Sequence, residues 1–199
     1  MSEMEMKTMK TMKGTQTEKN LLAAFAGESQ ARNRYTFYAS KAKKEGYVQI
    51  SNLFTETAAN EKEHAEVFFK HLQGGDVEIM AAYPAGIIGT TEENLLAAAE
   101  GEKMEWGELY PDFAQIAEDE GFPEVAESFR QIAKVEAYHE KRYRKLYDNV
   151  KNGTVFKKGQ KTKWKCSNCG YVIECDEAPH KCPACQHPQS YYERWVENY

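Results

Sequence analysis

The stretch TEKNLLAAFAGE at residues 17–28 recurs as TEENLLAAAEGE at residues 91–102, with nine of twelve positions identical at an offset of 74. Farther along, AKKEGY at residues 42–47 matches AEDEGF at residues 117–122 at an offset of 75. The offset of 75 also relates Phe54 to Phe129, Glu61 to Glu136 and His64 to His139. The chain therefore contains two copies of one unit, and the second copy carries one additional residue.

Each copy has the pattern of a helical hairpin. Apolar residues such as Leu21 and Phe25 recur at the spacing of one helix face, and Gly46 and Gly121 mark the turns. The Gly-rich, apolar stretch at residues 72–91 is too long for a tight turn and predicts a crossover. We therefore expect a mainly α fold, a ferritin-like four-helix bundle with a long crossover, followed by a small metal-bound β domain.

The additional residue of the second copy predicts an irregularity in the third helix. We place it between Leu109 and Ala117, beside Pro111, where we expect a kink or a π-bulge.

Acidic residues fall on the inward helix faces, where a core is expected. Glu28 follows Phe25 by three positions, and Glu61 follows Phe54 by seven and precedes His64 by three. The duplication supplies a matching set, consisting of Glu102, Glu136 and His139. Buried carboxylates require a neutralising cation, and a Glu from each of two helices with a Glu-x-x-His from each of the others is typical of a site for two iron or manganese ions.

A single Glu-x-x-His pair usually marks a solvated helix face, but duplication in register favours metal ligands. The acids off the inward stripe, Glu56, Glu63 and Glu140, are interpreted as surface residues. Glu105 lies one helical turn after Glu102, where the first copy has Ala31. It is a candidate seventh ligand, and a surface acid is the alternative from spacing alone.

All five cysteines lie in the last 34 residues, and four of them form two CxxC pairs separated by twelve residues: Cys166, Cys169, Cys182 and Cys185. Four thiolates in this spacing fit a tetrahedral iron or zinc ion. The segment is too short to fold by apolar burial alone, so metal binding should stabilise it. Cys175 lies outside the pattern and is interpreted as a spare thiol.

These features divide the chain into four parts. We expect a mobile leader at 1–16, a di-iron bundle at 17–150, a polar, Lys-rich linker at 151–162 and the cysteine module at 163–199. The net charge of −5 gives no basic surface for nucleic acid. No stretch approaches the roughly 20 apolar residues of a membrane span, and the leader lacks the apolar region of a signal peptide, so we expect a cytoplasmic protein.

Six segments carry a resemblance to the rubrerythrin family: AFAGESQARNRY, ETAANEKEH, AEGEKMEWGELYP, EAYHEKR, CSNCGY and CPAC. The resemblance covers nearly the whole chain and implies a non-haem di-iron centre, a rubredoxin-type Fe(Cys)4 centre and a peroxidase that reduces hydrogen peroxide to water. The cysteine module departs from free-standing rubredoxins in two ways. The gap between its cysteine pairs is shorter, and Gln186 follows the fourth cysteine, where glycine is usual.

By position, the resemblance implies a set of di-iron ligands: Glu28, Glu61, Glu102, Glu105, Glu136 and His139. It implies that His64 is a ligand in one oxidation state and that one iron moves between His64 and Glu105. It also suggests Tyr35 and Tyr110 as hydrogen-bonding groups beside the irons, with core packing as the alternative.

The resemblance further implies a head-to-tail homodimer, or a larger homo-oligomer, in which the cysteine module of one subunit serves the partner. The electron donor would be a rubredoxin or a NAD(P)H-dependent reductase. Three other functions stay open from the residues alone. These are ferritin-like iron oxidation and storage, dioxygen reduction, and a structural zinc ribbon in place of the Fe(Cys)4 site.

Overall fold

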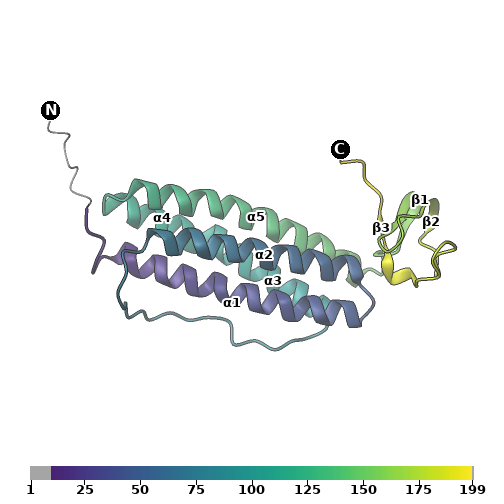
Figure 1. Ribbon diagram of the computed structural model, residues 1–199, viewed down its shortest axis with the longest axis horizontal. Coiled ribbons are helices and arrows are strands. Elements are labelled where there is room, and N and C mark those ends of the chain that lie inside the picture. Colours follow the sequence, from purple (N-terminus) through teal and green to yellow (C-terminus); the bar gives the residue numbers. More distant parts are fainter. Residues whose placement is uncertain (1–9, 199) are drawn as a thin grey trace.

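The computed structural model describes residues 10–198 and is built on two helical hairpins (Figure 1). The first contains α1 (Gln16–Lys44) and α2 (Val48–His71). The second contains a third helix in three parts, α3 (Thr91–Met104), the π-helix η1 (Glu105–Leu109) and α4 (Tyr110–Asp119), followed by α5 (Pro123–Lys151). The predicted ferritin-like four-helix bundle is confirmed. Within the described range, no helix combines the length and apolar character that crossing a membrane requires.

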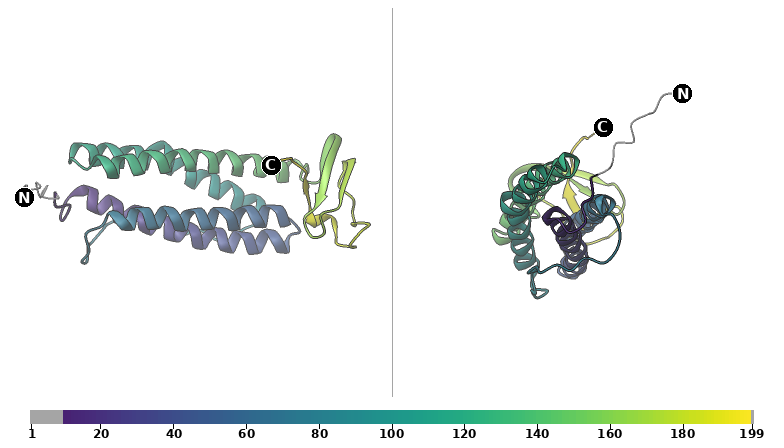
Figure 2. Two further views of the ribbon diagram at one scale, coloured as in Figure 1. Left: turned by 45° about the horizontal axis from the view of Figure 1, so that its top comes forward. Right: turned by 90° about the vertical axis from the view of Figure 1, so that its left-hand side faces the viewer.

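The segment between α2 and α3 is the predicted crossover. It runs outside the bundle along α1, from the end of α2 to the opposite end where α3 begins (Figures 1 and 2). The Tyr83 hydroxyl donates a 2.8 Å hydrogen bond to the Ala23 carbonyl and fastens the crossover to α1. The Tyr83 ring packs beside Gly27 of α1, where a Cβ would lie 3.7 Å from the ring, at ordinary contact distance.

The turn of each hairpin caps the other hairpin. The Thr91 N–H, at the start of α3, donates to the Glu45 carboxylate at 2.8 Å. In the other direction, the N–H of Thr17 in α1 donates to Glu120 at 2.8 Å. Free N–H groups at a helix start favour a carboxylate, so these reciprocal contacts join the two copies at both ends of the bundle.

The third helix contains the predicted π-bulge, but at a different position. The Tyr110 N–H bonds to the Glu105 carbonyl, five residues back, so the irregularity lies at Glu105–Leu109 and not after Leu109. Pro111 lies in the first turn of α4, where a missing N–H costs little. The π-helix accommodates the additional residue of the second copy and keeps both ends of the third helix in register with α1.

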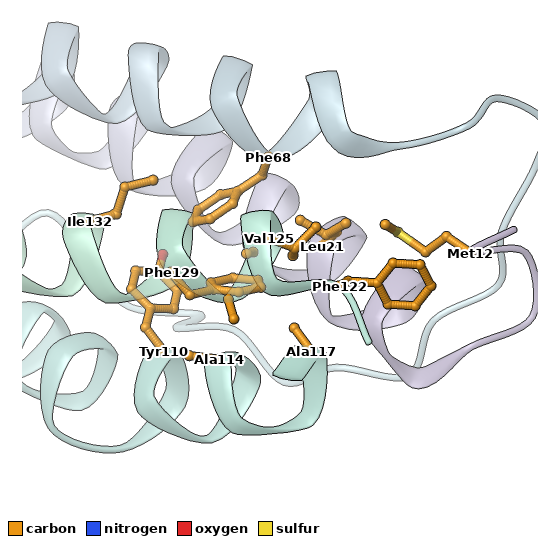
Figure 3. Close-up of a cluster of buried hydrophobic side chains, with 12 residues drawn as sticks. Met12, Leu21, Phe68, Tyr110, Ala114, Ala117, Phe122, Val125, Phe129 and Ile132 are labelled. Atoms are coloured by element: carbon orange, nitrogen blue, oxygen red, sulfur yellow. The ribbon is translucent and has the colours of Figure 1, made fainter. Parts of the chain in front are cut away.

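The apolar core forms two clusters along the bundle, and Figure 3 shows the cluster next to the turn between α4 and α5. Phe68, Tyr110 and Phe129 pack there, with ring centroids of Phe68 and Phe129 4.8 Å apart. Met12 is only 4% exposed and belongs to this cluster. Met12 of the predicted leader thus packs against the bundle, while residues 1–9 of that leader lie outside the described residues.

The C-terminal module is a three-stranded antiparallel sheet beyond the end of the bundle (Figure 2). Its strands β1 (Lys157–Cys166), β2 (Val172–Glu177) and β3 (Tyr192–Arg194) lie in the order β2-β1-β3, with the short helix η2 (Gln189–Tyr191) before β3. Because β1 begins at Lys157, the second half of the predicted linker is strand. Phe156 stacks on Tyr47 at the start of α2, with ring centroids 6.2 Å apart.

Candidate metal centres

All four helices of the bundle contribute polar side chains to one buried position. The residues predicted from the repeat, each at most 9% exposed, are Glu28 on α1, Glu61 and His64 on α2, Glu102 on α3, and Glu136 and His139 on α5. Apolar clusters flank this position along the bundle axis. The structure therefore brings six predicted ligands together inside the bundle.

These side chains form two overlapping groups, each with its ligand atoms within 4.8 Å of one another. One group is Glu28, Glu61, His64 and Glu136, and the other is Glu61, Glu102, Glu136 and His139. Glu61 and Glu136 belong to both groups. Glu136 turns one oxygen to 2.8 Å from His64 Nδ1 and the other to 2.8 Å from His139 Nδ1. This is the arrangement that two adjacent metal ions with two bridging carboxylates require.

Several of these buried atoms make no hydrogen bond of good geometry among the described residues, although Glu136 lies within ion-pair distance of His64 and His139. The atoms without such a bond are Glu28 Oε2, Glu61 Oε1, Glu102 Oε2, both carboxylate oxygens of Glu136 and His139 Nδ1. Buried charges without partners are strongly unfavourable. Carboxylate oxygens and imidazole nitrogens are ligands that iron accepts, so the donor set fits two iron ions in both chemistry and placement.

The pKa values of the cluster show the same electrostatic conflict. Burial raises the pKa of Glu28 and of Glu102 well above the ordinary value, and neighbouring carboxylates add to the effect. Burial opposes protonation of His139, but contacts with Glu102 and Glu136 outweigh it and raise its pKa to about 12. Without a metal the site must hold protons, and metal binding would release them.

Two tyrosines hold the carboxylates from the other copy of the repeat. Tyr35 Oη donates to Glu102 at 2.5 Å, and Tyr110 Oη donates to Glu28 at 2.6 Å. Both rings are 2% exposed. Each tyrosine fixes one oxygen of its carboxylate and leaves the other oxygen facing the cluster, as a group that orients a metal ligand should do.

Glu105 lies beside the cluster but in neither group of four. It is the first residue of η1, is partly exposed and faces a cavity of about 780 Å³ between the crossover and the third helix. Burial and Glu102 raise its pKa, whereas Arg34, which lines the same cavity, lowers it. Of the predicted ligands in the bundle, Glu105 alone stands away from the two groups.

One buried residue at this site was missed by the sequence argument. Tyr143 is fully buried, lies 5.4 Å from Tyr35 between ring centroids, and has a hydroxyl without a hydrogen-bond partner among the described residues. Its signal in the sequence is its position seven residues after Glu136 on the same face of α5.

The four predicted cysteines meet in the C-terminal module. Cys166 and Cys185 have sulfurs 3.7 Å apart, and the sulfurs of Cys169 and Cys182 are separated by the same distance. A tetrahedron with metal–sulfur bonds of about 2.3 Å places its sulfurs about 3.8 Å apart. The four thiols therefore already have the spacing of a tetrahedral metal site, whereas Cys175 turns its thiol to the Glu177 carbonyl.

Both parts of the chain are similar to known protein families. The sequence model described as Rubrerythrin matches residues 19–147, and the one described as Rubrerythrin, rubredoxin-like domain matches residues 164–193. The chain belongs to the rubrerythrin family. As a member of that family of iron oxidoreductases it has a di-iron site candidate in the bundle and a rubredoxin-like four-cysteine site, which confirms the predicted cofactors.

Two curated rubrerythrins and one solved structure illustrate the similarity. Rubrerythrin of Porphyromonas gingivalis is 61% identical, over 96% of this chain and 95% of its own length. Rubrerythrin of Nitratidesulfovibrio vulgaris is 56% identical, over 93% of this chain and 97% of its own length. A structure described as fully reduced, all-ferrous nigerythrin aligns with a TM-score of 0.61 at 30% identity, over 96% of this chain and 91% of that chain.

Proposed function

We propose that this protein is a cytoplasmic non-haem di-iron peroxidase, which reduces hydrogen peroxide to water and protects against oxidative stress. The observation that carries the proposal is the pair of buried groups that share Glu61 and Glu136, in one chain with a four-cysteine site. A di-iron site alone also suits iron storage, but storage needs no electron carrier, and the four-cysteine site is one.

The proposed ligands follow from the two groups. Glu61 and Glu136, which belong to both groups, would hold both irons, with Glu28 and His64 as further ligands of one iron and Glu102 and His139 of the other. In the module, the proposed ligands are Cys166, Cys169, Cys182 and Cys185. Residues 17–150 and 163–199 are the proposed functional units.

Reduction of one hydrogen peroxide to two waters consumes two electrons and two protons. The iron pair, when bound, supplies both electrons together, and the four-cysteine iron returns electrons one at a time. The protein holds the reacting position in a buried part of the bundle, and its tyrosines keep Glu28 and Glu102 oriented as carboxylates. Burial of the site limits the access of water and the side reactions that water would allow.

We further propose that His64 and Glu105 exchange as ligands of one iron when the oxidation state changes. The position of His64 in a group of four, with Glu105 outside both groups, corresponds to one end of this exchange. Glu105 begins η1, and π-helical turns are frequent at functional sites because their backbone hydrogen bonds are irregular. That irregularity would give the Glu105 carboxylate room to move toward the iron.

The distance between the module and the di-iron site within one chain favours a head-to-tail homodimer. Within one chain the module packs at the start of α2 through Tyr47 and Phe156, whereas Glu61 lies 13 residues beyond the first residue of α2, which is about 20 Å at 1.5 Å per residue. The module of one subunit is therefore proposed to serve the iron pair of its partner. A rubredoxin or a NAD(P)H-dependent reductase would supply the electrons.

The proposal is tested by separating one turnover from sustained turnover. A Cys166→Ser variant, reduced chemically, should be reoxidised once by hydrogen peroxide but should lose sustained peroxide consumption with a reductase as donor. The matched control is Cys175→Ser, which removes the thiol outside the cluster and should consume peroxide normally. Sustained consumption by Cys166→Ser would contradict the proposed relay.

A further inference from the structure

A long cavity lies beneath the crossover, with a volume of about 780 Å³. Its walls are the crossover, α1 and the third helix, and on α1 it extends from Gln16 to Arg34, which is about 27 Å at 1.5 Å per residue. Hydrogen peroxide has only one more oxygen atom than water, whose share of the liquid volume is about 30 Å³. The cavity is therefore many times larger than hydrogen peroxide, and its volume lies in the usual range of sites for small organic molecules, about 300–1,000 Å³.

The inner wall of this cavity reaches the ligand cluster. It includes Glu105 and Tyr110, and the Tyr110 hydroxyl donates to Glu28 at 2.6 Å. Most of the other lining residues are apolar or aromatic, such as Ala23 on α1 and Tyr83 in the crossover. An apolar group in the cavity would thus lie beside the proposed iron pair.

Glycine keeps the α3 wall of the cavity open. Gly101 lies inside α3, where glycine is less favourable than alanine. A Cβ at Gly101 would meet no atom within 4 Å outside its own stretch of helix, so close packing does not require glycine there. Its counterpart in the first repeat, Gly27, lines the same cavity from α1. What Gly101 supplies is therefore space beside the cluster.

Two buried N–H donors of the cavity lining lack acceptors among the described residues. They are Asn20 Nδ2 and Arg34 Nη1, and the Asn20 side chain is 4% exposed. In the second repeat Asn94, the counterpart of Asn20, donates its amide to the Gly89 carbonyl at 3.1 Å. Because buried donors are usually satisfied, the free donors of the cavity fit a ligand that carries oxygen acceptors.

We propose that the cavity beneath the crossover binds organic hydroperoxides, with the apolar group between the crossover and α1 and the hydroperoxide toward Glu105. The proposal rests on the proposed function, to which it adds a second class of substrate. In the reaction the O–O bond breaks, the reduced iron pair supplies two electrons, and two protons are taken up. The oxygen bonded to carbon leaves as an alcohol, and the other oxygen leaves as water.

Ala23 offers a variant that narrows the cavity, and Ala26 offers a matched control. Both are partly exposed residues of α1, but of the two only Ala23 lines the cavity. The iron-loaded, full-length protein should consume cumene hydroperoxide as well as hydrogen peroxide. Ala23→Leu should lower the ratio of kcat/KM for cumene hydroperoxide to that for hydrogen peroxide at least about tenfold, and Ala26→Leu should leave this ratio unchanged.

The assay with two substrates separates this inference from the proposed function. Consumption of hydrogen peroxide but not of cumene hydroperoxide would overturn the inference and leave the proposed function standing. Consumption of neither would overturn the proposed function itself. A ratio in Ala23→Leu equal to that of the unmodified chain would show that the organic group binds elsewhere, which also overturns the inference.

A second measurement reads binding without turnover, using 2-phenyl-2-propanol, the alcohol that cumene hydroperoxide leaves. In the anaerobically reduced, iron-loaded protein, unpaired electrons of the irons should accelerate the relaxation of the alcohol protons in NMR. Ala23→Leu should remove most of this acceleration, and Gly101→Leu narrows the opposite wall in case Ala23→Leu does not fold. Equal relaxation in the unmodified and the narrowed proteins would overturn the proposal.

Discussion

Tyr35 of the first repeat donates its hydroxyl to Glu102 of the second repeat at 2.5 Å, inside the bundle. The equivalent residue of the second repeat, Tyr110, donates to Glu28 of the first. Each half of the duplicated chain therefore orients a carboxylate that belongs to the other half. A change in one tyrosine should affect the metal site more than it affects the fold.

Tyr35→Phe should weaken iron binding or peroxide turnover by about 10- to 100-fold, the usual effect of removing a group that orients a metal ligand. The ring and its packing remain, so the melting temperature should change little. The control is Tyr38→Phe, because Tyr38 packs on Tyr35 with centroids 6.3 Å apart, whereas the hydrogen bond to Glu102 comes from Tyr35. Iron content and turnover equal to those of Tyr38→Phe would show that the hydrogen bond is unimportant.

Glu105→Ala gives the second repeat the residue that the first has at Ala31. Because the two groups of four do not include Glu105, both irons should still bind. Peroxide turnover should fall at least about tenfold, since the proposed exchange with His64 is lost. Iron analysis together with steady-state rates checks this. Loss of one iron would mean that Glu105 is a permanent ligand, and full activity in Glu105→Ala would exclude the exchange.

The free energy of unfolding of the bundle should depend on pH through Glu120, which lies outside the metal-ligand cluster. Partial burial acts to raise its pKa, but hydrogen bonds from Thr17 and Gln16 outweigh it and lower the pKa. Because the pKa is lower in the folded than in the unfolded chain, the carboxylate stabilises the fold above the ordinary pKa of about 4.3. This contribution is lost as pH falls through the folded-state pKa.

Glu120→Gln should therefore lower the free energy of unfolding by about 1 kcal/mol at pH 7, the usual value of a helix cap. The difference from the unmodified chain should shrink in acid below the ordinary carboxyl pKa. Urea unfolding of both proteins at matched pH values measures it, with Asp76→Asn in the exposed crossover as the control. An equal difference at neutral and acid pH would contradict the carboxylate's role.

Removal of the metal from the four-cysteine site should unfold the C-terminal module and leave the bundle helical. The module core is small, with Trp164 and Tyr192 as its large fully buried side chains, so metal binding must supply much of its stability. Cys182→Ser should lose the iron–thiolate absorption and expose Trp164, which its fluorescence reports. A Trp164 that stays buried in Cys182→Ser would show that the module folds without its metal.

The fold and the ligand cluster could be predicted because the chain is duplicated. A single Glu-x-x-His pair is a weak signal, but Glu61 with His64 recurs as Glu136 with His139 at one offset. The spacing placed these residues on inward faces, where the structure has them. Tyr143 was missed because an aromatic residue on an inward face is ordinary core, and only the folded chain shows its hydroxyl beside the cluster.

The repeat limits the position of the π-helix but does not fix it: Tyr110 matches Tyr35 at the offset of 75, so the additional residue lies between Glu102 and Tyr110, before the position predicted from the sequence. Between Glu102 and Tyr110 the two copies share no identical run that fixes where the additional residue lies. Only the backbone hydrogen bonds place it at Glu105–Leu109. Met12 was similarly unpredictable, because it is an isolated apolar residue whose burial depends on the cluster that contains Phe122, more than 100 positions away.

Hydrogen peroxide is the proposed oxidant of the reduced iron pair. The most direct measurement adds one equivalent of hydrogen peroxide to the anaerobically reduced protein and follows its visible spectrum, beside a sample given dioxygen instead. Peroxide should reoxidise the protein rapidly, and dioxygen should react more slowly. A reduced spectrum that peroxide leaves unchanged would contradict the peroxidase and favour dioxygen reduction or iron storage.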